Sequence, residues 1–345
     1  MNKHEHYMQR ALELAQSGLG LVEPNPMVGC VIVCDDKIIG EGFHHEFGGP
    51  HAEVVAIRSV KNQELLQRST LYVTLEPCSH HGKTPPCSDL IIEKGIPHVV
   101  IANSDPFEKV NGSGIEKLRS AGIEVEVGVF AQEGKKLNKR FFTFHQKKRP
   151  YIILKWAQSA DGYIDKTRDE KNNRATKISG QQSQVLVHQW RTQEQAILVG
   201  KNTALLDNPF LTARLYSGRQ PKRFVFDPHL ELSSNLHVFG EEAASYILNY
   251  QKKDDLNHLH YRIIEQDNVL ESLMNIFYEE QILSVLIEGG TYTLQHFIDE
   301  GLWDEARVFT SPLFIGEGIK SPQLSRTANE HYSIGEDHLT IIYNV

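Results

Sequence analysis

The first half of the chain contains three residues whose side chains are of the types that zinc prefers. His51 offers an imidazole, and Cys78 and Cys87 offer thiolates. Three protein ligands leave the fourth position of a tetrahedral ion open for water. Glu53 follows the histidine by two residues, and a carboxylate that does not bind the metal can carry a proton from that water to a substrate. These residue types predict a hydrolytic zinc site in which Glu53 is catalytic.

Two other interpretations of these residues stay open. A structural zinc site has a fourth protein ligand, which His80 or His81 could supply. A zinc-stabilised module without catalysis has no use for Glu53. The remaining cysteines, Cys30 and Cys34, belong to an apolar stretch and are predicted to be core residues.

Predicted helix starts would position the ligands. Residues 71–75 predict a strand that ends shortly before Cys78, and residues 88–94 predict a helix that begins beside Cys87. Another helix is predicted from His51 onward. A helix N-terminus lowers the pKa of a thiol and favours the thiolate that binds metal. We therefore expect the ligands to meet where these helices begin.

The rest of the first half alternates between helical and strand patterns. Helices are predicted at 7–15 and 114–121, and strands at 28–34, 38–43, 98–102 and 123–129. Asp35-Asp36 is typical of a hairpin turn between two of these strands. This alternation predicts an α/β layered domain around a mixed sheet.

A basic and aromatic segment, residues 135–149, closes the first half. Its interleaved Lys, Arg and Phe residues could stack on nucleic-acid bases. We favour instead an amphipathic closing helix followed by a polar linker at 145–150, where a second domain begins.

The second half also has an α/β pattern. Strands are predicted at 151–156, 196–199, 224–226 and 284–287, and helices at 181–192 and 293–299. The chain has no G-x-G-x-x-G fingerprint, so an ordinary Rossmann dinucleotide site is not predicted. Glu288-Gly289-Gly290-Thr291 joins an apolar strand to a helix and could present backbone N–H groups to an anion. A plain strand-to-helix turn fits the same residues.

Composition limits the class of protein. The chain has 345 residues, of which 40% are hydrophobic and 23% charged, and its formal net charge is -8. These values predict a globular protein of two domains that is not a general polyanion binder. Four cysteines without a disulfide framework, no apolar signal region and no run long enough for a bilayer predict a cytoplasmic protein. We expect small-molecule ligands and neither nucleic acid nor a membrane.

The motifs of the first half resemble one family closely. Asn25-Pro26-Met27-Val28-Gly29, His44, His51-Ala52-Glu53, and the segments 74–80 and 82–87 are similar to the deaminase half of the bifunctional riboflavin-biosynthesis deaminase–reductases. The eight residues between the two cysteines are that family's own spacing. The resemblance implies a cytidine-deaminase-like three-layer α/β/α domain over residues 1–146. It also implies that Asn25, His44 and Lys83 bind the substrate of this domain.

The second half resembles the reductase half of the same family. The matching motifs are the segments 155–162, 197–203, 207–209 and 211–214, and the Glu-Gly-Gly turn. The resemblance implies a dihydrofolate-reductase-like α/β domain over residues 147–345, with NADPH as cofactor. The implied cofactor-binding residues are Ala157, Lys177, Thr203, Asp207, Gly290, Thr291 and Leu294. The implied substrate-binding residues are Ala175, Arg191, Leu211, Arg214 and Glu288.

One segment departs from the family pattern. The family commonly has Ser-x-Trp-Ile-Thr/Ser before the first helix of the reductase half, whereas residues 175–179 read Ala-Thr-Lys-Ile-Ser. The serine that would contact substrate and the tryptophan that would cover the cofactor are absent, which leaves the contacts of this segment open.

The resemblance implies a two-step activity in riboflavin biosynthesis. The first domain would deaminate 2,5-diamino-6-ribosylamino-4(3H)-pyrimidinone 5′-phosphate, and the second would reduce the ribosyl group of 5-amino-6-(5-phosphoribosylamino)uracil. We also expect a homo-oligomer, either a dimer or a tetramer. A nucleic-acid deaminase is the alternative, and the acidic net charge and the complete second domain disfavour it.

Overall fold

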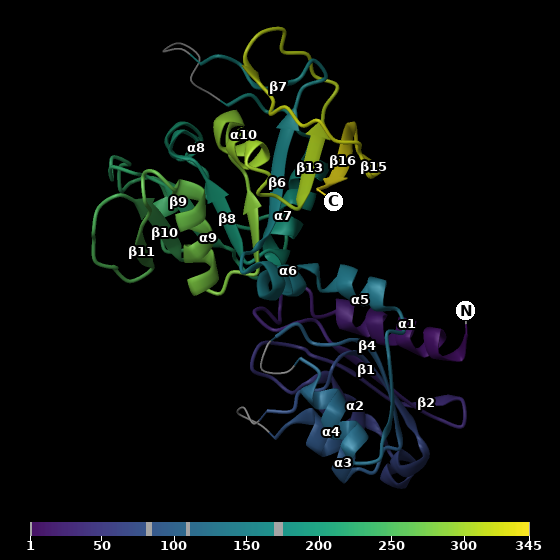
Figure 1. Cartoon of the computed structure of the whole chain (residues 1–345). Helices are drawn as coiled ribbons and strands as arrows, with labels where there is room; N and C mark the ends of the chain where they lie inside the picture. The colour runs from purple at the N-terminus through teal and green to yellow at the C-terminus, as the bar shows by residue number, and fades with distance from the viewer. Residues whose placement is uncertain (1, 81–84, 108–110, 169–174, 345) are drawn as a thin grey trace. The chain divides into compact units, whose positions relative to one another are not determined.

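A five-stranded sheet and a nine-stranded sheet belong to two separate units of the chain, Met1–Lys148 and Arg149–Val345. The computed structural model describes residues 2–80, 85–107, 111–168 and 175–344, and Figure 1 shows them coloured along the chain. The division between the units lies close to the predicted boundary after residue 146. No helix within the described ranges is long and apolar enough to cross a membrane.

The sheet of the first unit combines antiparallel and parallel pairs in the order β2-β1-β3-β4-β5. Its strands are β1 (Gly29–Cys34), β2 (Lys37–Phe43), β3 (Thr70–Leu75), β4 (His98–Asn103) and β5 (Glu124–Val127). Strand β1 is antiparallel to β2 and β3, whereas β3, β4 and β5 are parallel. Asp35 and Asp36 have φ angles of 48° and 60°, as a two-residue type I′ hairpin turn requires. The predicted mixed sheet and its hairpin are therefore confirmed.

Helices cover both faces of this sheet, because alternate side chains of a strand point to opposite faces. The helices are α1 (Lys3–Gln16), α2 (Ala52–Ser59), η1 (Gln63–Arg68), α3 (Cys87–Glu93), α4 (Ser113–Ser120) and α5 (Ala131–Leu137). Cys30 and Ile32 of β1 share a core with α2, α3 and α4, whereas Val31 and Val33 pack against α1 on the other face. Cys30 and Cys34 are buried, as predicted. The result is a three-layer arrangement (Figure 1).

Glycines on β2 let α2 approach the sheet closely. A Cβ atom at Gly42 would lie 2.5 Å from the backbone nitrogen of Ala56, and one at Gly40 would lie 2.6 Å from the carbonyl oxygen of Ala56. His51 is the extended residue immediately before α2. The close packing of α2 therefore fixes the place at which this histidine enters the site.

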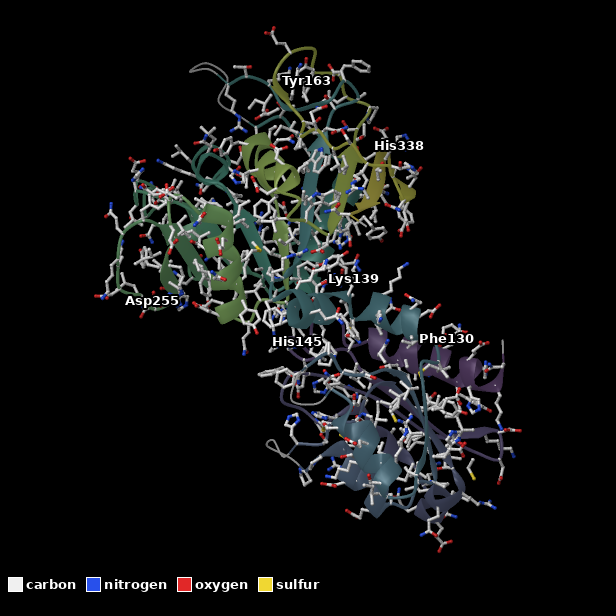
Figure 2. All side chains as sticks on the ribbon, viewed as in Figure 1. Phe130, Lys139, His145, Tyr163, Asp255 and His338 are labelled. Atoms are coloured by element: carbon white, nitrogen blue, oxygen red, sulfur yellow. The ribbon has the colours of Figure 1, made fainter. Side chains whose placement is uncertain are left out.

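The end of the first unit differs from its prediction. Two helices, α5 and α6 (Lys139–Lys147), replace a single closing helix, and α6 continues through the first half of the expected linker at 145–150. His145 packs on Phe141 with a ring-centroid distance of 4.4 Å, and Figure 2 labels Lys139 and His145 on this helix. The linker prediction was wrong because the aromatic face of α6 extends one residue past Phe144 to His145.

The sheet of the second unit has the order β11-β10-β9-β8-β12-β6-β13-β16-β15. Its strands are β6 (Tyr151–Gln158), β8 (Ala196–Val199), β9 (Lys222–Phe226), β10 (Ser245–Asn249), β11 (Leu259–Ile263), β12 (Ser284–Ile287), β13 (Glu305–Thr310), β15 (Glu330–Ile334) and β16 (Asp337–Tyr343). Neighbours from β11 to β13 are parallel, and the last two pairings are antiparallel. Strands β7 (Tyr163–Asp165) and β14 (Ile319–Lys320) form a separate pair.

Helices also cover both faces of the larger sheet. They are α7 (Gln181–Gln193), α8 (Lys201–Asp207), η2 (His237–Phe239), α9 (Val269–Glu279) and α10 (Thr291–Asp299). Side chains of α9 and α10 share a core with Leu154 and Val285, whereas Trp190 of α7 packs with Ile153 and Phe309 on the opposite face. The sequence analysis did not predict α8, α9 or the strands after β12, since short apolar runs carry little periodicity.

Candidate active sites

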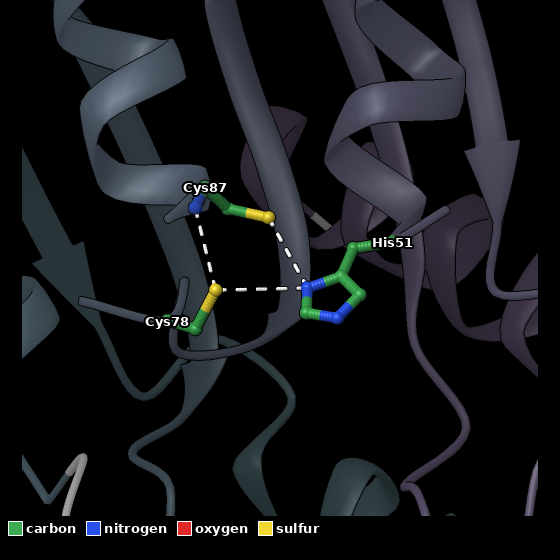
Figure 3. A group of neighbouring side chains, drawn as sticks. All are labelled: His51, Cys78 and Cys87. Carbon is green, nitrogen blue, oxygen red and sulfur yellow. Dashed lines mark hydrogen bonds between the residues drawn. The ribbon is translucent and has the colours of Figure 1, made fainter. Parts of the chain in front are cut away.

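Three side chains of the first unit converge as the sequence predicts. The Nδ1 atom of His51 lies 3.6 Å from the Cys78 sulfur and 3.3 Å from the Cys87 sulfur, and the three ligand atoms lie within 4.8 Å of one another. Figure 3 shows how His51 approaches from the start of α2 while the two cysteines flank the start of α3. The imidazole and two thiols fit a zinc ion with an open fourth position.

The electrostatics of this cluster favour a metal-binding thiolate. The pKa of Cys78 is lowered to about 4, chiefly by hydrogen bonding from Cys87 and then from His51. Its partner Cys87 has a pKa raised above the usual range by the hydrogen bond to Cys78 and by burial. The hydrogen bond to Cys78 also raises the pKa of His51 to about 9. The hydrogen bonds of the cluster therefore favour the thiolate form of Cys78, which is the form that binds metal.

His80, one of the two predicted fourth ligands of a closed structural site, is not part of the cluster. His80 is exposed and lies outside it, and the metal-type group within the described residues consists of His51, Cys78 and Cys87. His81 lies outside the described residues. Among the described residues the cluster therefore has the three protein ligands that an open site requires.

Glu53 lies in the first turn of α2, beside the cluster, and its side chain is buried. Burial raises the pKa of Glu53 to about 7, with the charge of His51 acting in the opposite direction. A carboxyl group that titrates near neutrality can both accept and donate a proton. These properties suit the predicted acid–base role.

Two of the three predicted substrate residues also meet at this site. The Nδ2 group of Asn25 lies 3.0 Å from Nε2 of His44, and Nδ1 of His44 lies 3.0 Å from the carbonyl oxygen of Pro50. Nδ1 of His44 must donate to that carbonyl, so Nε2 accepts from Asn25. The ring of His44 packs edge-on against His51 at 5.7 Å between centroids. Lys83, the third predicted residue, lies outside the described residues.

Sequence analysis overlooked Glu76, which secures the loop that carries Cys78. Its buried carboxylate accepts backbone N–H groups from Asp105, Gly112, Gly114 and Ile115 at 2.9–3.3 Å. These bonds tie the end of β3 to the start of α4. A charged residue at the end of an apolar strand, directly before a metal-ligand motif, was the signal that could have identified it.

The second unit contains a cavity of about 1440 Å³. It opens where β6, β8 and β12 end, at the edge of a parallel sheet that ligands commonly occupy. Its volume exceeds the roughly 300–1,000 Å³ of an ordinary ligand pocket, so it has room for more than one ligand. Five cationic and three anionic side chains line it, which favours phosphorylated ligands despite the acidic chain.

The cavity brings together most of the residues predicted for the reductase site. The lining includes Ala157, Ala175, Lys177, Arg191, Thr203, Asp207, Leu211, Glu288, Gly290 and Thr291. Leu294 is instead fully buried in the apolar core, and Arg214 is not among the lining residues. Helix α10 lines the cavity with residues 291–293, His296 and Phe297, but not with Leu294.

Arg191 and Glu288 form an ion pair inside this cavity. Nε and a terminal nitrogen of Arg191 each donate to a different Glu288 oxygen at 2.9 Å, and Nζ of Lys155 lies 3.5 Å from the same carboxylate. Burial alone would raise the pKa of Glu288, but Arg191 and Lys155 hold it at about 2. Arg191 also donates to the Thr212 carbonyl at 3.0 Å. Its charge is therefore largely compensated by the protein itself.

Arg214 has a different environment. Its guanidinium lies 4.3 Å over the ring of Phe210 and donates to Oγ1 of Thr212 at 3.1 Å. No carboxylate in the described part of the chain forms an ion pair with it. Unlike Arg191, Arg214 therefore has no ion-pair partner among the described carboxylates, but it is not among the residues that line the cavity.

The predicted cofactor residue Asp207 binds a side chain that sequence analysis overlooked. Arg168 donates to Asp207 at 2.5 Å and to Asp165 at 2.7 Å. Asp165 also accepts the backbone N–H of Thr176 at 3.0 Å, so it supports the segment that departs from the family pattern. Arg168 and Thr176 both line the cavity.

The starts of α8 and α10 fit a phosphate-bearing cofactor. A Cβ atom at Gly200 would lie 2.7 Å from Oγ1 of Thr293, and one at Gly289 would lie 2.9 Å from Cβ of Thr293. The glycines therefore allow the two helix starts to approach each other, and the backbone N–H groups of α10 remain available to an anion.

Comparison with known proteins agrees with both sites. Residues 1–103 match the family described as the cytidine and deoxycytidylate deaminase zinc-binding region, and residues 150–339 match the RibD C-terminal domain. The riboflavin biosynthesis protein RibD of Aquifex aeolicus is 40% identical over 321 residues, covering 91% of this chain and 88% of that protein. The RibD protein of Escherichia coli is 36% identical over 334 residues, covering 92% and 89%.

Solved structures are similar to this chain over nearly its full length. A Thermotoga maritima protein, described as a diaminohydroxyphosphoribosylaminopyrimidine deaminase/5-amino-6-(5-phosphoribosylamino)uracil reductase, has a TM-score of 0.89 and 40% identity, covering 99% of this chain and 98% of that one. Acinetobacter baumannii RibD has a TM-score of 0.91 and 32% identity with the same coverage. The resemblance and fold class predicted from the motifs are confirmed: this chain belongs to the RibD family of riboflavin-biosynthesis deaminase–reductases, with an N-terminal cytidine-deaminase-like domain and a C-terminal dihydrofolate-reductase-like domain.

Proposed function

We propose that the first unit deaminates 2,5-diamino-6-ribosylamino-4(3H)-pyrimidinone 5′-phosphate and that the second unit reduces the product with NADPH. The reduced bond is in the ribosyl group of 5-amino-6-(5-phosphoribosylamino)uracil, which becomes ribityl. The observation that carries the proposal is the meeting of His51, Cys78 and Cys87 beside a buried Glu53. The two activities are assigned to residues 1–146 and 147–345.

Residues of the first unit would position the pyrimidine and move protons. Zinc, when bound, activates water for attack on the amidine-like carbon at C2. Glu53 receives the proton of the attacking water and delivers protons to the ring nitrogen and to the leaving ammonia. The amide nitrogen of Asn25 donates to His44. The Oδ1 atom of Asn25 is therefore left to accept a hydrogen bond from the exocyclic amine of the substrate. Lys83 would bind a ribose or phosphate oxygen.

Residues of the second unit would orient two ligands. NADPH, when bound, supplies a hydride to C1′ of the sugar. Ala157, Lys177, Thr203, Asp207 and the start of α10 at Gly290 and Thr291 would hold the cofactor, whereas Leu294 belongs to the core. Ala175, Arg191, Leu211, Arg214 and Glu288 would hold the ribose phosphate. Positioning accounts for the catalysis, because no side chain needs to form a covalent bond.

The thiolate ligands also bear on the cellular compartment of the protein. Cys78 and Cys87 must stay reduced to bind zinc, which suits the cytoplasm. We further propose a homo-oligomer, a dimer or a tetramer, whose mass light scattering of the purified protein would measure.

An assay of the purified protein with the diamino-pyrimidinone phosphate tests the proposal. We expect ammonia release without NADPH, and NADPH oxidation only after deamination. Elemental analysis should find one zinc per chain in the parent and a loss of zinc in Cys78→Ser, with Cys30→Ser as the control for a buried cysteine outside the cluster. Full zinc retention in Cys78→Ser, or no ammonia release by the zinc-loaded parent, would contradict it.

A further inference from the structure

Helix α7 presents two polar side chains to the backbone of the segment 209–215. Arg191 donates to the carbonyl oxygen of Thr212 at 3.0 Å. His188, three residues earlier and therefore on the same helix face, accepts at Nδ1 the backbone N–H of Arg214 at 2.7 Å and that of Leu215 at 3.2 Å. One donor and one acceptor of α7 thus fix the path of this segment.

The hydrogen bonds determine the charge of His188. A ring nitrogen that accepts two N–H groups carries no proton, so the imidazole is neutral with its proton on Nε2. The surroundings agree, because burial, followed by the charges of Arg191 and Arg214, lowers the pKa of His188 to about 4. Glu288 opposes this effect and Lys155 reinforces it. His188 therefore remains an acceptor at neutral pH.

The segment that His188 holds carries two predicted substrate residues, Leu211 and Arg214. Leu211 has a φ angle of 56°, which is unfavourable for a residue with a side chain, so the chain turns sharply just before Arg214. The Arg214 guanidinium rests on Phe210 and on Oγ1 of Thr212, within the same segment. Its position therefore depends on where the backbone of the segment is held.

We propose that His188 is a positioning residue of the reductase site, whose neutral imidazole holds the Arg214 main chain so that the guanidinium meets the substrate phosphate. This inference rests on the proposed function, since it requires an anionic ribose-phosphate substrate. Neither His188 nor Arg214 is among the residues that line the cavity, whose lining reaches the segment 209–215 at Pro209 and Leu211. It acts through the backbone of Arg214 and does not contact the substrate.

Asn and Gln substitutions both keep a hydrogen-bond acceptor at residue 188, but they place it at different positions. Asn carries its amide oxygen near the place of the imidazole Nδ1, whereas Gln carries it near the place of Nε2. We expect His188→Asn to keep the KM for 5-amino-6-(5-phosphoribosylamino)uracil within about twofold of the parent. His188→Gln should raise that KM about five- to tenfold, the effect of losing one or two modest hydrogen bonds. In both variants kcat and the Kd for NADPH should change by less than about twofold.

His258→Leu is the matched control. His258 also binds backbone in the second unit, with Nε2 2.9 Å from the Phe239 carbonyl oxygen, but it contacts η2 and not the segment 209–215, so the KM should not change. Equal KM values for His188→Asn and His188→Gln would overturn the inference, and so would a rise in the NADPH Kd that parallels the KM. If the parent oxidises no NADPH with this substrate, the reductase assignment fails first and the inference with it.

Discussion

The two candidate sites of this protein are built on different scales. In the first unit, three donor atoms lie within 4.8 Å of one another beside a single buried carboxylate. In the second, a cavity of about 1440 Å³ is lined by side chains from strands, helices and loops. A metal ion needs a few donors at fixed distances, whereas a dinucleotide and a sugar phosphate need an extended surface. Few residues are critical in the first site, and many share the binding in the second.

This contrast sets the size of the expected mutational effects. Where one group moves the proton, no neighbour can replace it. Where several polar groups share the contacts to a ligand, the loss of one leaves the others in place. The following measurements test that contrast, beginning with the largest effect.

Glu53→Gln should lower the rate of ammonia release by about two to four orders of magnitude, because glutamine keeps the shape of the side chain but cannot relay a proton. Zinc content and NADPH oxidation with the already deaminated substrate should be unchanged. Glu64→Gln, at an exposed glutamate of the same unit, is the control and should behave as the parent. Near-normal ammonia release by Glu53→Gln would remove Glu53 from the mechanism.

Arg214→Ala should raise the KM of the reductase for its substrate about ten- to a hundredfold, the effect of losing one charge-assisted contact worth about 1.5–3 kcal/mol. The affinity for NADPH should change little. Arg326→Ala, which removes an exposed guanidinium that hydrogen-bonds to Asn344, far along the chain from the segment 209–215, is the control. An altered NADPH affinity with an unchanged substrate KM would instead place Arg214 on the cofactor side.

Glu288 should make the second unit sensitive to acid. Its pKa is about 2 when folded and near 4.5 without the surrounding structure, so its ion pair stabilises the fold fully above pH 4.5 and is lost as the pH falls toward 2. Since one pKa unit corresponds to about 1.4 kcal/mol, the loss is of the order of a few kcal/mol.

Tryptophan fluorescence can follow this unfolding. Trp156, Trp190 and Trp303 are the three tryptophans of the chain, and all belong to the second unit. Urea midpoints measured between pH 3 and 7 should fall less steeply in Glu288→Gln than in the parent, and the exposed-site control Glu271→Gln should follow the parent. If the urea midpoints of Glu288→Gln and of the parent fell equally steeply with pH, the role of this ion pair would be refuted.

The smallest effect is expected when the first unit is removed. Residues 149–345 should fold and oxidise NADPH with the deaminated substrate at about the parental rate, because the cavity is lined by residues of this unit alone. The same steady-state assay on the fragment and on the full chain makes the comparison. A folded fragment without activity would show that the reductase depends on the first unit.

Much of the first site was predictable from the sequence, because metal chemistry restricts the residue types. His51, Cys78 and Cys87 were identified by type and spacing, and the structure brings them together. Glu76 was not predicted, since its role depends on four backbone N–H groups that come from distant segments. No local pattern indicates which carboxylate will receive such bonds.

The second site was predictable only in part. The motifs identified Arg191, Glu288 and the turn at Gly290, but not the pairing of Arg191 with Glu288 that compensates its charge. Leu294 was predicted to bind cofactor, yet its side chain belongs to the core. The helical period places Leu294 on the buried face of α10, which becomes evident only once the sheet beneath the helix is known.

The sequence by itself determined the residue types on which the proposed chemistry rests: the imidazole and two thiols of the metal-type cluster, the carboxylate beside them, and the order of the two α/β units. The candidate site residues follow from residue types that few other chemistries require. The order of the units follows from a spacing of apolar residues that few other folds satisfy. Tertiary structure alone decided which charges are compensated and which remain available. Arg191 and Arg214 are the same residue type in the same motif region, but Glu288 neutralises the first and no described carboxylate pairs with the second. Burial and distance set that difference, because the strength of a charge depends on the groups that the fold places beside it.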